Sequence, residues 1–177
     1  ILFSNPIEKN IFPQNSVFNA IHFRENFGTV DLLLHKIPSN QNVTEIIQIT
    51  AKNFKGLTHR TEYFSTKNSI DFYDDSISSN PDTSVAAIKF FSTNLGAIVL
   101  GGYSGGGTYD CVFKTLKTDS PEAFIWLPKS NTQSEILTIA QKYNFNPQQI
   151  IQGLDFEDLL AEGFWKLKKK SAVVLSP

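Results

Sequence analysis

The chain has 177 residues, and its 16 basic side chains nearly balance its 17 acidic ones, so the formal net charge is −1. This balance excludes the strongly positive surface of a nucleic-acid-binding protein and the polybasic segment of a membrane anchor. No apolar run approaches the roughly 18 residues of a membrane span, and residues 1–6 lack the basic and apolar regions of a secretory signal. We therefore expect a cytoplasmic protein with neither nucleic acid nor a membrane as partner.

Cysteine and histidine are scarce. The single cysteine, Cys111, excludes an internal disulfide, and the three histidines form no Cys/His cluster for a structural zinc. The sequence therefore predicts no metal site. Methionine is absent, and the chain stops directly after the apolar run at 172–175. Because chain ends are usually polar and frayed, we expect this polypeptide to be a piece of a longer protein.

The first 56 residues differ in character from the rest. Residues 1–20 are rich in Asn, Phe and Pro and have weak strand character. Residues 25–35 and 43–54 are predicted helices, joined by a polar turn at 38–42. We expect this part to be a small, mainly helical unit.

Strand-like and helix-like segments alternate from residue 61 onward, which predicts an α/β, Rossmann-like three-layer domain around a mostly parallel sheet. The expected strands are 61–66, 69–74, 97–100, 123–127 and 171–175, and the expected helices are 81–91, 108–117, 130 or 131 to 142, and 155–168. Pro128 is expected to end its strand because proline cannot continue a ladder. The lysine run at 166–170 is expected to be the solvated end of the last helix, favoured by the helix dipole.

A glycine-rich segment, Gly101–Gly107, follows a predicted strand and precedes a predicted helix. Open α/β sheets bind ligands at this position, outside the carboxyl ends of their strands. The spacing matches neither the G-x-G-x-x-G fingerprint nor the phosphate-binding G-x-x-x-x-G-K-[ST] loop. A flexible loop without a ligand is an equally good interpretation.

A second polar segment, Tyr73–Pro81, carries two carboxylates and three serine hydroxyls between a strand and a helix that begins with proline. Free backbone N–H groups at a helix N-terminus can hold a polar or anionic ligand. The residues alone favour another interpretation, in which a serine or Asn80 caps the helix while Asp74 and Asp75 are solvated.

Arginine occurs twice, at Arg24 and Arg60, and each follows a histidine within two residues. The planar guanidinium presents a fork of donors that suits phosphate or carboxylate. A surface ion pair is the default role for a single arginine.

Taken together, these segments resemble the Mur ligase family. Residues 54–62, F-K-G-L-T-H-R-T-E, are similar to the F-x-G-L-P-H-R-x-E junction that opens the C-terminal domain of these enzymes, with Thr58 in place of proline. Residues 73–81 resemble the N-D-S-x-A-T-N segment, and residues 98–102 resemble the L-L-G-G strand end. Residues 22–26 are similar to the H-N-x-x-N that closes the central ATPase domain, with phenylalanine in place of the first asparagine.

The resemblance implies that residues 1–56 are the remnant of a central ATPase domain and that 57–177 form a C-terminal domain truncated at its end. It implies an ATP-dependent amide ligase of peptidoglycan synthesis that adds glutamate to UDP-N-acetylmuramoyl-alanine through an acyl phosphate. ATP and Mg²⁺ are the implied cofactors. The groups that hold the phosphates and the metal would lie before residue 1, in the remainder of the parent ligase. We therefore expect this chain alone to be inactive and to contain no catalytic residue.

The resemblance also implies roles for individual residues. Nucleotide-binding positions are Asn26 for adenine, Arg60 and Asp75 for the ribose, and the neighbouring His59; amino-acid-binding positions are Ser76, Ser78 and Ser79. Ile77 stands where the glutamate-adding enzymes carry a lysine, and the glycines of 101–107 replace another. Two alternatives stay open: another amino-acid specificity, such as L-glutamate, and a non-catalytic α/β interaction module.

Overall fold

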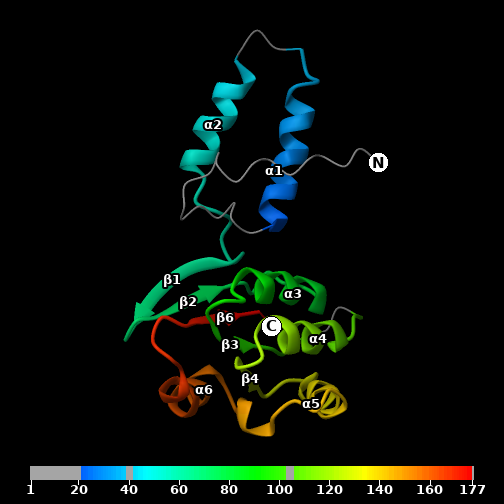
Figure 1. The fold of residues 1–177 in the computed structure, drawn as a ribbon, viewed down its shortest axis with the longest axis vertical. Helices are drawn as coiled ribbons and strands as arrows, with labels where there is room; N and C mark the ends of the chain where they lie inside the picture. The colour runs from blue at the N-terminus through cyan, green and yellow to red at the C-terminus, as the bar shows by residue number, and fades with distance from the viewer. Residues whose placement is uncertain (1–20, 39–41, 103–105, 177) are drawn as a thin grey trace. The chain divides into compact units, whose positions relative to one another are not determined.

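The computed structural model describes residues 21–38, 42–102 and 106–176. The chain divides into two compact units, Ile1–Gly56 and Leu57–Pro177, which are drawn in Figure 1 and described separately below. In the described ranges no helix combines the length and the apolar character needed to cross a membrane. The assignment of the first unit to a central ATPase domain stays a prediction.

Two helices form the described part of the first unit, α1 (Ile21–Leu34) and α2 (Val43–Asn53), close to the predicted ranges. Asn42 caps α2, because its side chain accepts a hydrogen bond from the Glu45 backbone N–H at 3.3 Å. Helix α2 buries Ile47 and Ala51. The strand character predicted for residues 1–20 falls outside the described residues.

The second unit is built on a six-stranded sheet with the order β1-β2-β6-β3-β4-β5. Its strands are β1 (Glu62–Lys67), β2 (Ile70–Asp74), β3 (Leu95–Val99), β4 (Phe124–Pro128), β5 (Ile150–Gly153) and β6 (Ala172–Leu175). Only the β1–β2 pair is antiparallel, and the other four pairs are parallel. The last strand therefore lies in the middle of the sheet, between β2 and β3. The predicted Rossmann-like α/β fold is confirmed.

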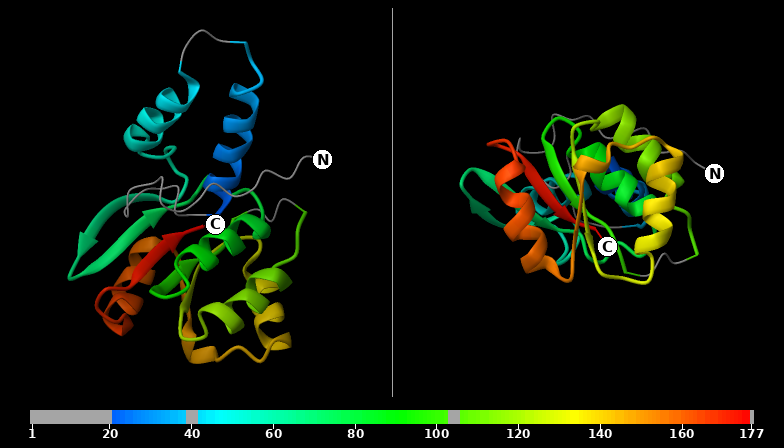
Figure 2. Two further views of the ribbon diagram at one scale, coloured as in Figure 1. Left: turned by 45° about the horizontal axis from the view of Figure 1, so that its top comes forward. Right: turned by 90° about the horizontal axis from the view of Figure 1, so that it is seen from below.

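Helices cover both faces of this sheet, as Figure 2 shows. They are α3 (Pro81–Phe90), α4 (Asp110–Asp119), α5 (Gln133–Lys142) and α6 (Phe156–Gly163), with short 3₁₀ turns at Pro147–Gln149 and Phe164–Lys166. Alternate strand residues point to opposite faces. Ile98, Ile125 and Val174 pack with α3, α4 and α5, whereas Ala97, Trp126 and Val173 pack with α6.

Strand β5 was not predicted from the sequence. It is a four-residue edge strand that contains Gln152 and Gly153 and follows a 3₁₀ turn, so it lacks a recognisable apolar pattern. Pro128 ends β4 as expected, one residue beyond the predicted range, and it still pairs with Gly153 of β5. The next ladder bond comes from the Lys129 N–H to the Gly153 carbonyl at 2.9 Å, so the proline at the strand end leaves that contact intact.

Two helix ends also differ from the predictions. The N-cap of α5 is Thr132 rather than Ser130 or Asn131, and no side chain accepts a capping bond there. Helix α6 begins after Asp155 as expected but ends at Gly163, not at residue 168. The lysines of the run at 166–170 are exposed, as expected, but the run begins at the last residue of a 3₁₀ turn and lies beyond the end of α6, so the helix-dipole explanation is wrong.

Candidate functional site

Hydrogen bonds join the carboxyl ends of three parallel strands at one edge of the sheet. The Asp75 N–H donates to the Leu175 carbonyl at 2.8 Å, and the Ser176 N–H donates to the Val99 carbonyl at 3.1 Å. The ends of β2, β6 and β3 therefore meet. This is the edge at which open α/β sheets bind ligands, and the predicted segments 73–81 and 101–107 both begin there.

Asp75 directly follows β2 at this edge and is only 3% exposed. Its Oδ1 accepts hydrogen bonds from the Thr61 N–H at 2.9 Å and the Thr61 hydroxyl at 3.2 Å. Its Oδ2 accepts from the hydroxyls of Ser78 at 2.5 Å and Ser176 at 3.4 Å. Four donors replace water, which is what a buried carboxylate requires. The interpretation of Asp75 as a solvated aspartate is therefore wrong, and its contact with a ribose stays a prediction.

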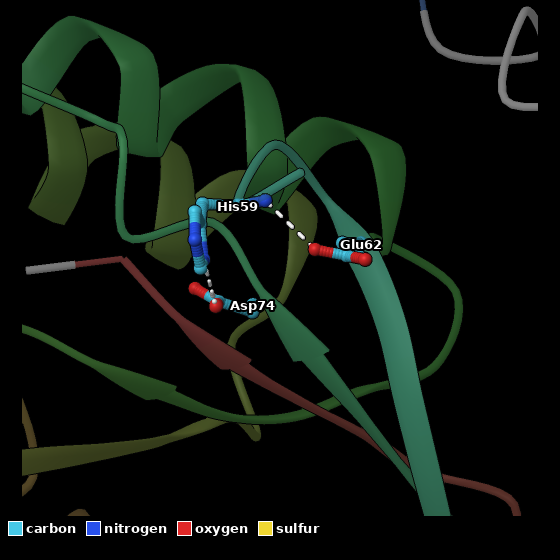
Figure 3. A group of neighbouring side chains, drawn as sticks. All are labelled: His59, Glu62 and Asp74. Atoms are coloured by element: carbon cyan, nitrogen blue, oxygen red, sulfur yellow. Dashed lines mark hydrogen bonds and ion pairs between the residues drawn. The ribbon is translucent and has the colours of Figure 1, made fainter. Parts of the chain in front are cut away.

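His59 and Asp74 form an exposed pair beside this network, shown in Figure 3. The His59 Nδ1 lies 2.7 Å from the Asp74 Oδ2, and the His59 backbone N–H donates to the Glu62 carboxylate at 2.8 Å. The hydrogen bond to Asp74 raises the pKa of His59 above its ordinary value. Partial burial works to raise the pKa of Asp74, but hydrogen bonds from His59 and Ser76 outweigh it and hold that pKa below its ordinary value.

Arg60 stands between two residues in the left-handed backbone region, His59 at φ 62° and Thr61 at φ 48°. The Ile77 N–H donates to the His59 carbonyl at 3.2 Å, so the segment around Arg60 is joined to segment 73–81. Arg60 is half-buried, and its guanidinium makes no hydrogen bond or ion pair with any residue that the structure describes. This fork of donors is thus free to take an anionic or hydroxylated ligand.

The serines of this segment divide into two kinds. Ser78 is buried against Asp75, whereas Ser76 and Ser79 are exposed. Asn80 caps α3 by accepting a hydrogen bond from the Thr83 N–H at 3.1 Å, so the capping interpretation is confirmed. The exposed hydroxyls of Ser76 and Ser79 are the ones that a ligand can reach from solvent.

The glycine segment is described only at its ends, because residues 103–105 lie outside the described ranges. Gly102 and Gly106 have φ values of 85° and 82°, which glycine adopts without strain. The Thr132 hydroxyl donates to the Gly102 carbonyl at 3.3 Å, so the loops after β3 and β4 are neighbours.

The remaining predicted nucleotide-binding residue, Asn26, lies in the first unit, where it is exposed on α1.

Sequence reasoning missed Thr61, Ser84 and Ser176. The Ser176 hydroxyl contacts both Asp75 and the Ser84 hydroxyl, the latter at 3.0 Å. Its partners are 101 and 92 residues away. Only the position of β6 between β2 and β3 brings these residues together, and no local pattern in the sequence signals it.

Comparison with known proteins gives a consistent family of relatives, although no protein-family model matches the chain. UDP-N-acetylmuramoylalanine--D-glutamate ligase of Alkaliphilus oremlandii is 32% identical over 168 residues, which cover 84% of this chain and 36% of that protein. The ligase of the same name from Thermoanaerobacter sp. strain X514 is 29% identical over 133 residues, covering 75% and 28%. The chain thus spans about a third of the length of these relatives.

A solved structure has a similar fold. The MurF ligase of Thermotoga maritima in complex with ADP superposes with a TM-score of 0.61 at 12% identity, covering 85% of this chain and 33% of that one. At this identity the likeness concerns the fold, which agrees with the mostly parallel sheet covered by helices on both faces.

Proposed function

We propose, from the relationship of this chain to the Mur ligases, that it is the C-terminal part of an ATP-dependent amide ligase of peptidoglycan synthesis. The parent enzyme would add glutamate to UDP-N-acetylmuramoyl-alanine. The observation that carries the proposal is the 29–32% identity to D-glutamate ligases over three-quarters or more of the chain. It is supported by the hydrogen-bonded meeting of the two motif segments, around Arg60 and Asp75, at the ligand-binding edge of the sheet.

In this proposal the nucleotide contacts the segment around Arg60. The free guanidinium fork would bind ribose or phosphate oxygens, with His59 beside it. The proposal keeps Asn26 as the residue that contacts adenine. Asp75 would accept a ribose hydroxyl only by exchanging one of its serine donors, because both of its oxygens are already hydrogen-bonded. The groups that hold the triphosphate and its Mg²⁺ are assigned to the remainder of the parent ligase.

The incoming amino acid would bind at the exposed hydroxyls of Ser76 and Ser79, while Ser78 acts indirectly through Asp75. Its amine would attack the acyl phosphate of the substrate, so that an amide bond forms and phosphate leaves. Ile77 is 50% exposed in the same loop and offers no charge to an acidic amino acid. For this reason the specificity for glutamate, and for its D isomer, belongs to the proposal and needs its own measurement.

The test is amino-acid-dependent phosphate release by the full-length parent with ATP, Mg²⁺ and UDP-N-acetylmuramoyl-alanine, comparing D-glutamate with L-glutamate. We expect release with D-glutamate. Arg60→Ala should raise the KM for ATP by about tenfold or more, since a lost charge-assisted hydrogen bond weakens binding by about 1.5–3 kcal/mol. Lys67→Ala is the matched control, because Lys67 is an exposed cation at the opposite end of β1 and should leave the KM unchanged.

Other outcomes would change the proposal in defined ways. Release with L-glutamate alone would keep the ligase and replace its specificity. A third outcome is that no acidic amino acid causes nucleotide-dependent phosphate release and that the Arg60→Ala variant behaves like the parent. This outcome would favour a non-catalytic α/β interaction module.

A further inference from the structure

Three potential metal ligands lie close together beside the edge where β2, β6 and β3 end, and we call them the His59 cluster: His59, Glu62 and Asp74. One ligand atom from each lies within 4.8 Å of the other two. The side chains come from the loop before β1, the first residue of β1 and the last residue of β2, as Figure 3 shows. Glu62 and Asp74 are direct partners in the antiparallel ladder, so the sheet itself fixes the two carboxylates close together.

The charges of the His59 cluster are not balanced within the described residues. Like charges on directly opposed residues of a β-ladder destabilise the pair. Asp74 forms an ion pair only with His59, which carries a full charge only when protonated, and Glu62 forms no ion pair with a described side chain. Arg60, the next residue, directs no ion pair at either carboxylate. A divalent cation between the three groups would remove this repulsion.

The donors are also held in position before any cation arrives. The His59 N–H donates to the Glu62 Oε2 at 2.8 Å, and the His59 carbonyl accepts from the Ile77 N–H at 3.2 Å. The Asp74 Oδ1 accepts from the Ser76 N–H at 2.9 Å, which leaves Oδ2 directed toward the imidazole. His59 is exposed, so a hydrated ion can reach the cluster from solvent.

We propose that the His59 cluster binds a divalent transition-metal ion of the zinc type. One imidazole nitrogen with two carboxylate oxygens is a donor set that suits Zn²⁺, whereas Mg²⁺ and Ca²⁺ prefer oxygen donors only. The metal would replace the hydrogen bond between His59 and Asp74. Three protein ligands leave at least one coordination position open to water or to a ligand bound at this edge. The inference does not depend on the ligase proposal, because it concerns the chain without nucleotide.

The test is calorimetric titration of the full 177-residue chain with ZnCl₂, supported by the visible absorption spectrum of bound Co²⁺. We expect one equivalent to bind, and His59→Ala and Glu62→Gln should each weaken binding by about tenfold or more, since even changes to groups outside the ligand shell cost about that much. MgCl₂ should bind far more weakly. The matched control is His35→Ala, because His35 faces Asp31 at 3.2 Å in a similar exposed pair, to which no other described residue adds a third ligand.

Binding of Zn²⁺ that is equally strong in wild type and in the Glu62→Gln variant would overturn the proposal, as would the absence of Zn²⁺ binding. Loss of binding in His35→Ala would place the metal in the first unit and overturn it too. Glutamine keeps an acceptor for the His59 N–H, so Glu62→Gln decides the question even if His59→Ala fails to fold.

Discussion

Thr61 donates both its backbone N–H and its hydroxyl to one oxygen of Asp75, at 2.9 and 3.2 Å, across 14 residues of sequence. The other oxygen accepts from Ser78 and from Ser176, so one buried carboxylate joins the segment before β1, the loop after β2 and the end of β6. Thr61 holds a left-handed φ of 48°, which is costly for a β-branched residue. The Asp75 carboxylate therefore positions the segment that carries Arg60.

Asp75→Asn should destabilise the second unit. The amide keeps one acceptor oxygen but turns an N–H₂ group toward hydroxyls that were donating to the carboxylate. We expect a loss of about 2 kcal/mol in the free energy of unfolding, the usual size for a buried hydrogen bond to a charged group. Urea unfolding followed by circular dichroism measures it. Asp71→Asn is the control, because Asp71 lies in β2, is half-exposed and accepts one side-chain hydrogen bond, from the Thr66 hydroxyl. It should change stability by much less, and an equal loss in both variants would contradict the assigned role.

The sequence predicted what depends on local pattern. Apolar runs at β3, β4 and β6 and the proline that starts α3 led directly to the correct fold class, because buried strands and helix starts have local signatures. The role of Asn80 as a helix cap was likewise predictable from the sequence. What the sequence did not reveal depends on strand order and register. Nothing local places Ser176 next to Asp75 or pairs Glu62 with Asp74, so neither the buried network nor the His59 cluster was predictable.

Acid should weaken the contact between α4 and α5. The Asp110 carboxylate accepts from the Lys142 ammonium at 2.5 Å, from the Thr108 hydroxyl at 2.6 Å and from the Tyr143 hydroxyl at 2.9 Å. Lys142 first, and then Thr108 and Tyr143, hold the pKa of Asp110 well below its ordinary value of 3.8. A carboxyl with a lowered folded-state pKa stabilises the protein fully above its unfolded-state pKa, and this contribution decreases below that value and is lost as the pH falls through the folded-state pKa.

Asp110→Asn should therefore lower the Tm at neutral pH, and the gap to wild type should stay constant down to about pH 5 and narrow progressively as the pH falls below about 4. Differential scanning calorimetry over this range measures the gap. Asp119→Asn, at the other end of α4, is the control, because no described lysine pairs with Asp119. If the Tm difference between wild type and Asp110→Asn stays constant with pH, the hydrogen bonds of Asp110 stabilise the protein through their geometry and not through the charge of the carboxylate.

The contact between α6 and the sheet depends on Gly163, which has no side chain. A Cβ added to Gly163 would lie 2.6 Å from Cε2 and 2.7 Å from Nε1 of Trp126, a fully buried residue of β4. Replacing glycine by alanine in a helix usually stabilises it by about 0.5–1 kcal/mol. Here the clash should dominate, because overpacking a dense core costs about 1–3 kcal/mol. We therefore expect Gly163→Ala to lower the free energy of unfolding.

Trp126→Phe is the second substitution of a double-mutant cycle with Gly163→Ala. The indole Nε1 is buried without a hydrogen-bond partner among the described residues, so phenylalanine removes an unsatisfied donor as well as the ring atoms that would clash. We expect the double variant to be less destabilised than the sum of the two single variants, with a coupling of about 1 kcal/mol, as is usual for residues in contact. Urea unfolding of all four proteins measures the coupling. Additive effects would mean that α6 shifts away from the sheet to accept the new methyl group.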